Sequence, residues 1–248
     1  TMMRDLFQFR FDSGSELAGH NFGNLFITVM TRLTGDFEKA IRETSKVLAL
    51  RGQVIPSTLS KVVLSARHKD GSVTDGEYKI TAARKPIEKV YLTPGDSPAS
   101  AEAVKAIERA DLIVLGPGSL YTSIIPNLLI QGITDALVAA KAAKVYVCNV
   151  MTQPGESDGY SASHHMRSLI EHSHPKVVDY CVVNTGSIAP DLLGRYVQEQ
   201  SFQVVNDRRK IEKMGYRVIE DDTISTDNYI RHDPMKLARL ILSLLDEG

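Results

Sequence analysis

The sequence predicts an α/β fold built on a mostly parallel, doubly wound sheet. From residue 87 onward, short apolar runs alternate with segments of helical spacing, which is the pattern of parallel strands joined by crossover helices. The 248 residues are 43% hydrophobic, enough to bury a sizeable core. No shift in composition divides the chain, so we expect a single α/β domain over residues 1–248.

The first third of the chain predicts two helices and an antiparallel excursion. Helical spacing predicts helices over 21–33 and 37–50, because Gly35 interrupts the pattern and Asp36 is a favoured N-cap. Two alternating stretches around a His-Lys-Asp-Gly turn then predict a small antiparallel hairpin excursion at about 53–85.

The rest of the chain predicts strands and helices in alternation. We expect strands over 87–92, 112–115, 145–150 and 177–183 with further ones near Val204 and Val218, and helices over 100–110, 123–142, 161–172, 191–200 and 234–245.

A glycine turn after the strand at 112–115 is the strongest sign of a ligand site. Gly116 and Gly118 lack the Cβ atoms that would hold an anion away from the backbone, and Ser119 and Thr122 add hydroxyl donors. A strand, glycine turn and helix together form a common phosphate site. The alternative is that the two glycines serve turn geometry only.

The match to a dinucleotide fingerprint is poor. The third glycine of that pattern is replaced by Tyr121, and the next strand is followed by Asn149 rather than by an acid. These departures disfavour an ordinary NAD dehydrogenase.

Polar segments follow three consecutive strands, at 116–119, 149–156 and 184–187. Because carboxyl ends of parallel strands meet at one edge of the sheet, we expect these segments to share one crevice. Asn149 and Asn184 each follow an apolar strand directly, and either amide could bind a base or sugar or could tie two loops together.

Hydrogen bonds from the glycine turn to a phosphate are too weak by themselves to bind a nucleotide. Three hydrogen bonds to a charged group contribute about 5–9 kcal/mol, against association costs of about 4–15 kcal/mol and a net of about 8 kcal/mol for micromolar binding. We therefore add Tyr196 as a stacking ring and Arg231 as a phosphate fork. The alternative for Arg231 is a surface ion pair with Asp227 or Asp233.

Composition excludes several classes of function. With 29 basic and 30 acidic residues the net charge is −1, which is not typical of a nucleic-acid surface. No apolar run is long enough to span a bilayer, and we expect no signal peptide and a cytoplasmic protein without membrane insertion. Cys148 and Cys181 lie in apolar runs, where reduced core cysteines are expected.

Candidate acid–base and metal residues are few. His20, at the start of the first helix, could act as a base or simply cap that helix, and Asp158 is the other weak candidate for a catalytic role. His165 and His172 are seven residues apart, but no cysteine or carboxylate joins them, so we expect no metal site.

Four segments together resemble a known family: 19–25, 116–128, 149–156 with Gly159-Tyr160, and 229–233. They are similar to the bacterial gluconeogenesis factors (YvcK-like), which are related to the 2-phospho-L-lactate transferases of deazaflavin-cofactor synthesis (CofD-like). The resemblance covers essentially the whole chain. It implies a Rossmann-like three-layer α/β/α fold, a UDP-sugar or NAD(P)-type dinucleotide as ligand, and a role in gluconeogenic growth, cell shape and envelope synthesis.

The chain departs from that family at its start. Members begin with a strand and a Gly-Gly-Gly-Thr-Gly turn, whereas this sequence begins Thr1-Met2-Met3-Arg4. The part of the family's phosphate site that this Gly-Gly-Gly-Thr-Gly turn forms is therefore either absent or outside the numbered residues.

Two functions follow. The first is a nucleotide-binding regulatory factor; the second is a phospholactate-transferase-type enzyme that releases a nucleotide, and a purely structural partner protein is a weaker third. The oligomeric state stays open, with a homo-oligomer among the options. The expected ligand-binding residues are His20, Asn21, Asn24, Gly116, Gly118, Ser119, Thr122, Asn149, Thr152, Asn184, Tyr196 and Arg231.

Overall fold

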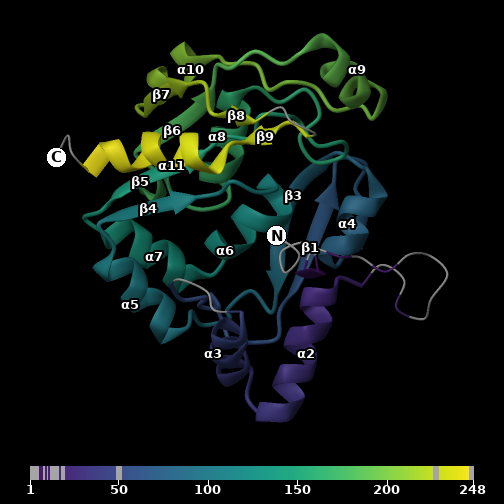
Figure 1. The fold of residues 1–248 in the computed structure, drawn as a ribbon, viewed down its shortest axis with the longest axis vertical. Helices are drawn as coiled ribbons and strands as arrows, with labels where there is room; N and C mark the ends of the chain where they lie inside the picture. The colour runs from purple at the N-terminus through teal and green to yellow at the C-terminus, as the bar shows by residue number, and fades with distance from the viewer. Residues whose placement is uncertain are drawn as a thin grey trace. The chain divides into compact units, whose positions relative to one another are not determined.

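The computed structural model describes residues 6–7, 9, 11, 17, 20–48, 52–225 and 229–245. The chain divides into two compact units, Thr1–Leu59 and Ser60–Gly248, and each is described by itself. Figure 1 labels the elements of both. The expected single domain stays a prediction.

The first unit holds the two helices that the sequence predicts. Helix α2 (Phe22–Thr34) is capped by Asn21, whose side chain accepts a hydrogen bond from the backbone N–H of Asn24 at 3.3 Å. Gly35 ends it in the left-handed region (φ 72°), and Asp36 caps α3 (Phe37–Val47) by accepting from the N–H of Lys39. Local capping chemistry therefore sets these boundaries.

The antiparallel excursion is a three-stranded sheet in the order β2-β1-β3. The predicted hairpin is confirmed, because β1 (Val63–His68) pairs antiparallel with β2 (Val73–Asp75). The second arm is shorter than predicted: Gly76 (φ 95°) turns the chain, and helix α4 (Glu77–Ala83) follows.

The strand predicted at 87–92 was assigned to the wrong sheet. It forms β3 (Ile87–Thr93), which pairs antiparallel with β1. Leu64 lies opposite Leu92 and Ala66 opposite Val90, so this pairing places buried apolar residues against each other.

The main sheet contains four parallel strands in the order β4-β5-β6-β7. They are β4 (Leu112–Leu115), β5 (Ala143–Val147), β6 (Tyr180–Asn184) and β7 (Arg217–Asp221). The predicted α/β class, with its parallel sheet and small antiparallel sheet, is confirmed. The order of these four strands runs in one direction, so the reversal that gives a doubly wound sheet its switch point does not occur among them.

Helices cover both faces of this sheet. Right-handed crossovers between strands in sequential order place the connecting helices on one face. Helix α11 (Pro234–Leu242) covers the other face, where Leu237 and Ile241 pack on Val145, Val147 and Val182. Figure 1 shows α11, in yellow, lying across the strands. These connecting helices are α6 (Ile125–Leu128), α7 (Gln131–Ala139), α8 (Ala162–Glu171) and α10 (Arg208–Lys213), and α5 (Ala101–Arg109) precedes β4. Helix α9 (Pro190–Gln198) packs instead beyond the strand ends, where Leu192 lies in a cluster with Val150, Met151, Ile224 and Ile230.

The single helix predicted over 123–142 is broken. A π-helical turn, η1 (Leu120–Ile124), runs into α6, and α7 then leaves at a bend of 75°. Ile130 is extended at the break, and the hydroxyl of Thr134 donates to the carbonyl of Leu128 at 2.6 Å. Among the described helices, none alone has the length and hydropathy of a membrane crossing, although this bent pair meets both criteria when it is taken together.

A short hairpin places the segment 229–233, which contains Arg231, beside the main sheet. Strands β8 (Ile224–Ser225) and β9 (Arg231–His232) pair antiparallel. The imidazole of His232 donates from Nε2 to the carbonyl of Cys148, just past β5, at 3.0 Å. Arg231 is thereby held near the carboxyl end of β5.

The two cysteines are buried and free, as predicted. Burial raises the pKa of both the Cys148 and the Cys181 thiol above the usual range, so both stay protonated at neutral pH.

Gly155 joins the small sheet to the main sheet by a close backbone contact. A Cβ on Gly155 would lie 2.5 Å from the Cα of Arg84, and its φ of 84° is left-handed. Gly159 is also left-handed (φ 68°), but nothing lies within 4 Å of the Cβ position there.

We therefore expect Gly155→Ala to destabilise the protein more than Gly159→Ala does. Both variants impose a left-handed alanine, at a cost of about 1–2 kcal/mol. Only Gly155→Ala adds a steric clash, worth about a further 1–3 kcal/mol. Urea denaturation followed by circular dichroism measures the difference, and equal free energies of unfolding would contradict the close contact.

Candidate functional site

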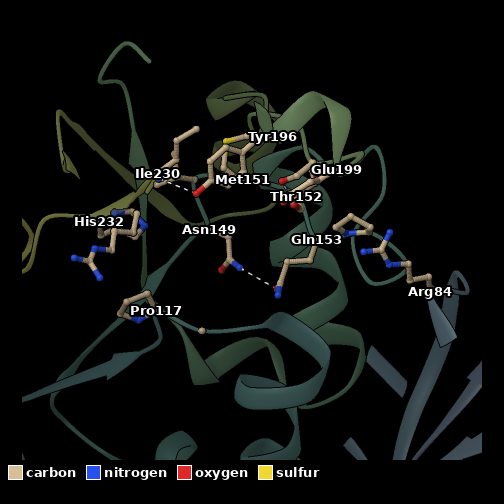
Figure 2. Close-up of a pocket in the computed structure, with 15 residues that line it drawn as sticks. Arg84, Pro117, Asn149, Met151, Thr152, Gln153, Tyr196, Glu199, Ile230 and His232 are labelled. Atoms are coloured by element: carbon tan, nitrogen blue, oxygen red, sulfur yellow. Dashed lines mark hydrogen bonds between the residues drawn. The ribbon is translucent and has the colours of Figure 1, made fainter. Parts of the chain in front are cut away.

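A pocket of about 460 Å³ lies at the carboxyl ends of β4 and β5. It contains five of the residues expected from the sequence, and Figure 2 shows several of them facing one hollow. These five are Gly118, Asn149, Thr152, Tyr196 and Arg231. Residues not expected from the sequence also line the pocket: Arg84, Pro117, Val150, Met151, Gln153, Pro154, Glu199, Ser201, Ile230 and His232.

The glycine turn needs both of its glycines. Gly116 has a φ of 98°, and a Cβ there would lie 3.1 Å from Cδ1 of Ile124 and 3.3 Å from the carbonyl oxygen of Val147. A Cβ on Gly118 would lie 3.3 Å from Cβ of Ser123. The turn thus packs tightly on both the following helix and β5, and backbone at Pro117 and Gly118 faces the pocket.

Three side chains link the ends of β4 and β5. The amide nitrogen of Gln153 donates to Oγ of Ser119 at 2.8 Å, and Nδ2 of Asn149 donates to Oε1 of Gln153 at 3.4 Å. Oδ1 of Asn149 is buried and has no partner among the described residues. Figure 2 shows the Asn149 and Gln153 side chains directed toward each other. Ser119 and Gly116, both expected at the site, do not line this pocket themselves: Ser119 is half-buried beside Gly118 and accepts the hydrogen bond that holds Gln153.

Tyr196 and Arg231 lie on the pocket wall as expected. The hydroxyl of Tyr196 accepts a hydrogen bond from the N–H of Ile230 at 2.9 Å, which fixes the ring. The Arg231 side chain forms no ion pair among the described residues. Asp233, one alternative partner, caps α11 instead by accepting from the N–H of Met235 and Lys236; Asp227 lies outside the described residues.

Arg84 adds a second cation that the sequence analysis missed. It ends α4 in the left-handed region (φ 48°), is exposed, and has no ion pair in the described part of the chain. In Figure 2 it lies on the opposite side of the pocket from His232. Glu199, at the end of α9, is the one carboxylate among the lining residues.

His232 holds a fixed tautomer. Because Nε2 donates to the Cys148 carbonyl, Nδ1 is the acceptor and receives the hydroxyl hydrogen of Thr223 at 2.9 Å. Burial lowers the pKa of His232, so the ring is neutral and positions Arg231 beside the pocket.

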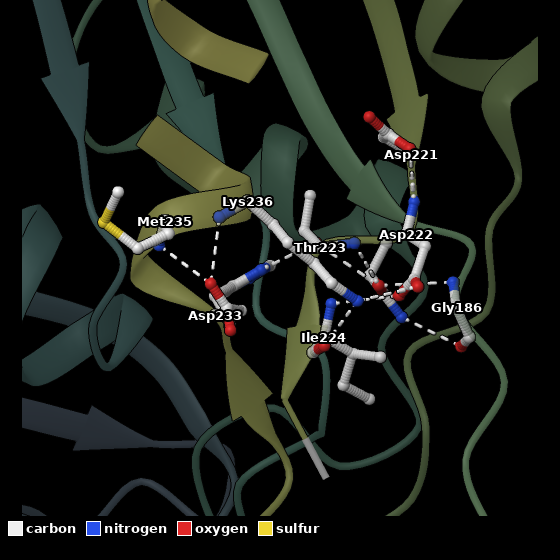
Figure 3. Close-up of polar contacts among 10 residues, drawn as sticks. Gly186, Asp221, Asp222, Thr223, Ile224, Asp233, Met235 and Lys236 are labelled. Carbon is white, nitrogen blue, oxygen red and sulfur yellow. Dashed lines mark hydrogen bonds and ion pairs between the residues drawn. The ribbon is translucent and has the colours of Figure 1, made fainter. Parts of the chain in front are cut away.

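The third strand end is closed to the pocket, contrary to expectation. Asn184 donates from Nδ2 to the carbonyl of Gly186, and its Oδ1 accepts from the N–H groups of Gly186 and Thr223. A Cβ on Gly186 would lie 2.7 Å from Cγ2 of Ile224. Figure 3 shows this crowding, with Lys236 paired to Asp222 beside it. Asn184 therefore ties two loops together, which is the second of its two alternatives.

Two expected hydroxyls also have structural partners. Thr122 donates to Oε1 of Glu156 at 3.2 Å and does not line the pocket. Thr152 lines it, but its Oγ1 accepts from the N–H of Phe202 at 2.9 Å. Both contacts stabilise the loops that form the pocket.

The remaining candidates belong to the first unit or contact another loop. His20, Asn21 and Asn24 belong to the first unit, Asn21 is the helix cap there, and the adjoining Gly19 lies outside the described residues. Asp158 accepts from the N–H of Gly155 at 2.7 Å and lines a separate hollow. Throughout the described ranges, no three His, Cys, Asp or Glu side chains form a group that could hold a metal ion.

Comparison with known proteins places the chain in a family. A family model described as 2-phospho-L-lactate transferase CofD matches residues 1–224. A gluconeogenesis factor from Bacillus subtilis is 43% identical over 99% of this chain and 78% of its own length. One from Halalkalibacterium halodurans is 42% identical over 97% of this chain and 75% of its own length.

A relative from Nostoc sp. is 44% identical over 97% of this chain, which spans 54% of that protein. Among solved structures, a crystal structure of a UPF0052 family protein from Bacillus halodurans has a TM-score of 0.89 and 42% identity. It covers 97% of this chain and 78% of that protein. These matches confirm the resemblance deduced from the sequence motifs.

The carboxyl group of Glu156, which accepts the hydrogen bond from Thr122, should make the stability of the protein depend on pH. Glu156 is buried, Oε2 has no partner among the described residues, and burial raises the pKa of its carboxyl above the usual 4.5. The folded protein therefore holds this proton to a higher pH than the unfolded chain, and stability falls as pH rises from about 4.5 through the raised pKa.

We expect Glu156→Gln, which stays neutral, to gain stability over the wild type as pH rises from 4 to 8, by about 1.4 kcal/mol per unit of pKa elevation. Denaturant midpoints across that range measure the gain. The exposed Glu108→Gln variant is the control and should follow the wild type. A pH-independent difference for Glu156→Gln would contradict a raised pKa of this buried carboxyl.

Proposed function

The chain belongs to the family of 2-phospho-L-lactate transferase CofD and the bacterial gluconeogenesis factors, and we propose that it binds a nucleotide-diphosphate ligand as a regulatory factor. The ligand is a UDP-sugar or an NAD(P)-type dinucleotide. The role is control of gluconeogenic growth, cell shape and envelope synthesis in the cytoplasm. A homo-oligomer is compatible with this role, which involves neither nucleic acid nor membrane insertion.

The observation that supports this proposal best is the pair of arginines at one pocket. Arg84 and Arg231 both line it, and neither has an ion pair among the described residues. Guanidinium groups bind phosphate oxygens through two parallel hydrogen bonds, so an arginine on each side of the pocket suits a ligand that carries phosphate.

The rest of the lining suits the rest of a nucleotide. Backbone at Gly118 can approach a phosphate without a side chain in the way, and the fixed ring of Tyr196 can stack on a base. Glu199 can accept hydrogen bonds from ribose hydroxyls. Hydrogen bonds from both arginines supply about 1.5–3 kcal/mol each, so these other contacts are needed for micromolar binding.

A second candidate function is a nucleotide-releasing transferase of the 2-phospho-L-lactate type. The match of residues 1–224 to the CofD model favours it. Incubation with a nucleotide-linked phospholactate and a deazaflavin acceptor distinguishes the two, because only a transferase releases nucleotide.

Calorimetry tests the binding proposal directly. We expect UDP-N-acetylglucosamine or NAD to bind the protein with a sub-millimolar Kd, and uridine to bind more weakly because it lacks phosphate. No heat with either nucleotide at these concentrations would contradict the proposal.

The arginine pair predicts a specific mutational pattern. Arg84→Met and Arg231→Met keep the apolar stem but remove the charge, and each should weaken nucleotide binding about tenfold to a hundredfold. Arg239→Met, on the exposed side of α11, is the matched control and should leave the Kd unchanged. Equal affinity of all three variants and the wild type would argue against a two-cation site.

A further inference from the structure

We infer that Ser119, Gln153 and Asn149 form a hydrogen-bond relay, which makes the pocket select phosphorylated ligands that present a hydrogen-bond donor to Asn149. Asn149 is then a specificity-determining residue and Gln153 a positioning residue. The inference rests on the proposed function, because it assumes a phosphate at the glycine turn.

The contacts give the relay a direction. Gln153 donates to Ser119 at 2.8 Å, so the Ser119 oxygen is an acceptor. Ser119 is half-buried beside Gly118, which lines the pocket, and a phosphate against Gly118 is the acceptor that we assign to the Ser119 hydrogen. Oε1 of Gln153 then accepts from Nδ2 of Asn149 at 3.4 Å. The amide of Asn149 is oriented with its oxygen away from Gln153.

That oxygen is where the relay ends. Oδ1 of Asn149 is buried and has no partner among the described residues, although Asn149 lines the pocket. Buried polar atoms in folded proteins nearly always have a hydrogen-bond partner, since an unpaired one is costly. Because Oδ1 has almost no accessible surface in this structure, the Asn149 side chain must turn slightly toward the pocket for a ligand donor to become that partner.

A bound phosphate selects this direction over the reverse one. If both amides were turned over, Ser119 would donate to Gln153 and Asn149 would present its NH₂ group to the ligand. Phosphate oxygens only accept hydrogen bonds, so a phosphate at Ser119 needs the Ser119 hydrogen for itself. Ser119 must then accept from Gln153, and Asn149 must present its oxygen.

The ligand chemistry follows from this direction. The ligand carries a phosphate oxygen near Ser119 and an N–H or O–H group near Asn149. In a uridine nucleotide these donors are the imide N–H of the base and the ribose hydroxyls.

Ligand analogues identify the donor. Calorimetry on the complete 248-residue chain compares UDP with N3-methyl-UDP, 2′-deoxy-UDP and 3′-deoxy-UDP. We expect at least one analogue to bind the wild type about tenfold to a hundredfold more weakly than UDP, because it leaves Oδ1 of Asn149 unpaired. The weakened analogue identifies base or ribose as the donor.

Variants show whether the discrimination passes through the relay. In Asn149→Ala the same analogue should bind within about twofold of UDP. Gln153→Ala should reduce the discrimination, while Gln131→Ala, an exposed glutamine on α7, should keep it. The same comparison is made without phosphate, between uridine and the uridine that carries the same modification. The ratio of these two Kd values should be smaller than the ratio for the two diphosphates, because no phosphate is present to hold the relay in its direction.

The outcomes separate the two proposals. If wild-type protein binds UDP but treats every analogue alike, or if Asn149→Ala keeps the discrimination, the relay is wrong and the nucleotide site stands. If the wild type binds no UDP, the uridine form of the proposed function fails and the relay fails with it. Thermal melts of each variant check that the fold is retained, and the wild-type analogue series does not depend on any variant.

Discussion

The parallel pairing of β4 with β5 is the constraint on which the pocket depends. Leu115 lies opposite Tyr146 at the carboxyl end of this pair, so the glycine turn and the segment from Asn149 leave the sheet side by side. Gly116 lets the chain turn at once, because a Cβ there would press on the carbonyl oxygen of Val147. The contact of His232 with the Cys148 carbonyl then holds β9 at the same edge. The pocket is thus a consequence of sheet register, one left-handed glycine and one buried imidazole.

Most polar side chains around this edge stabilise loops. Thr122, Thr152 and Asn184 each bond to a neighbouring segment, and these bonds hold the loops in place around the pocket. A ligand is left with backbone at the glycine turn, two arginines without ion pairs among the described residues, a fixed tyrosine ring and the oxygen of Asn149. The cations and the backbone of the glycine turn suit phosphate groups, and the acceptor oxygen of Asn149 suits an N–H or O–H group elsewhere on the ligand, which is why we place binding ahead of catalysis.

Local signals predicted the strands and the glycine turn well, because buried apolar runs and glycines determine their own conformations. Local signals could not show that Asn149 lines the pocket and Asn184 does not, because both residues follow apolar strands in the same way. Asn184 is taken up by hydrogen bonds to Gly186 and to Thr223, and the contact with Thr223, which is distant in sequence, cannot be read from a local pattern. Arg84 reaches the pocket only because Gly155 allows two backbones to meet, and no local pattern reports that contact. The misplaced β3 did carry a signal: its exposed Glu88, Lys89 and Tyr91 are typical of a strand with one solvent-facing side, not of a strand buried on both.

In the proposed complex, phosphate groups lie between the glycine turn and the arginines. A crystal structure of the protein soaked with UDP-N-acetylglucosamine tests it most directly. We expect diphosphate density against Gly118 and Ser119, within hydrogen-bonding distance of at least one of Arg84 and Arg231. Nucleotide bound at another surface, with this pocket filled only by solvent, would contradict it.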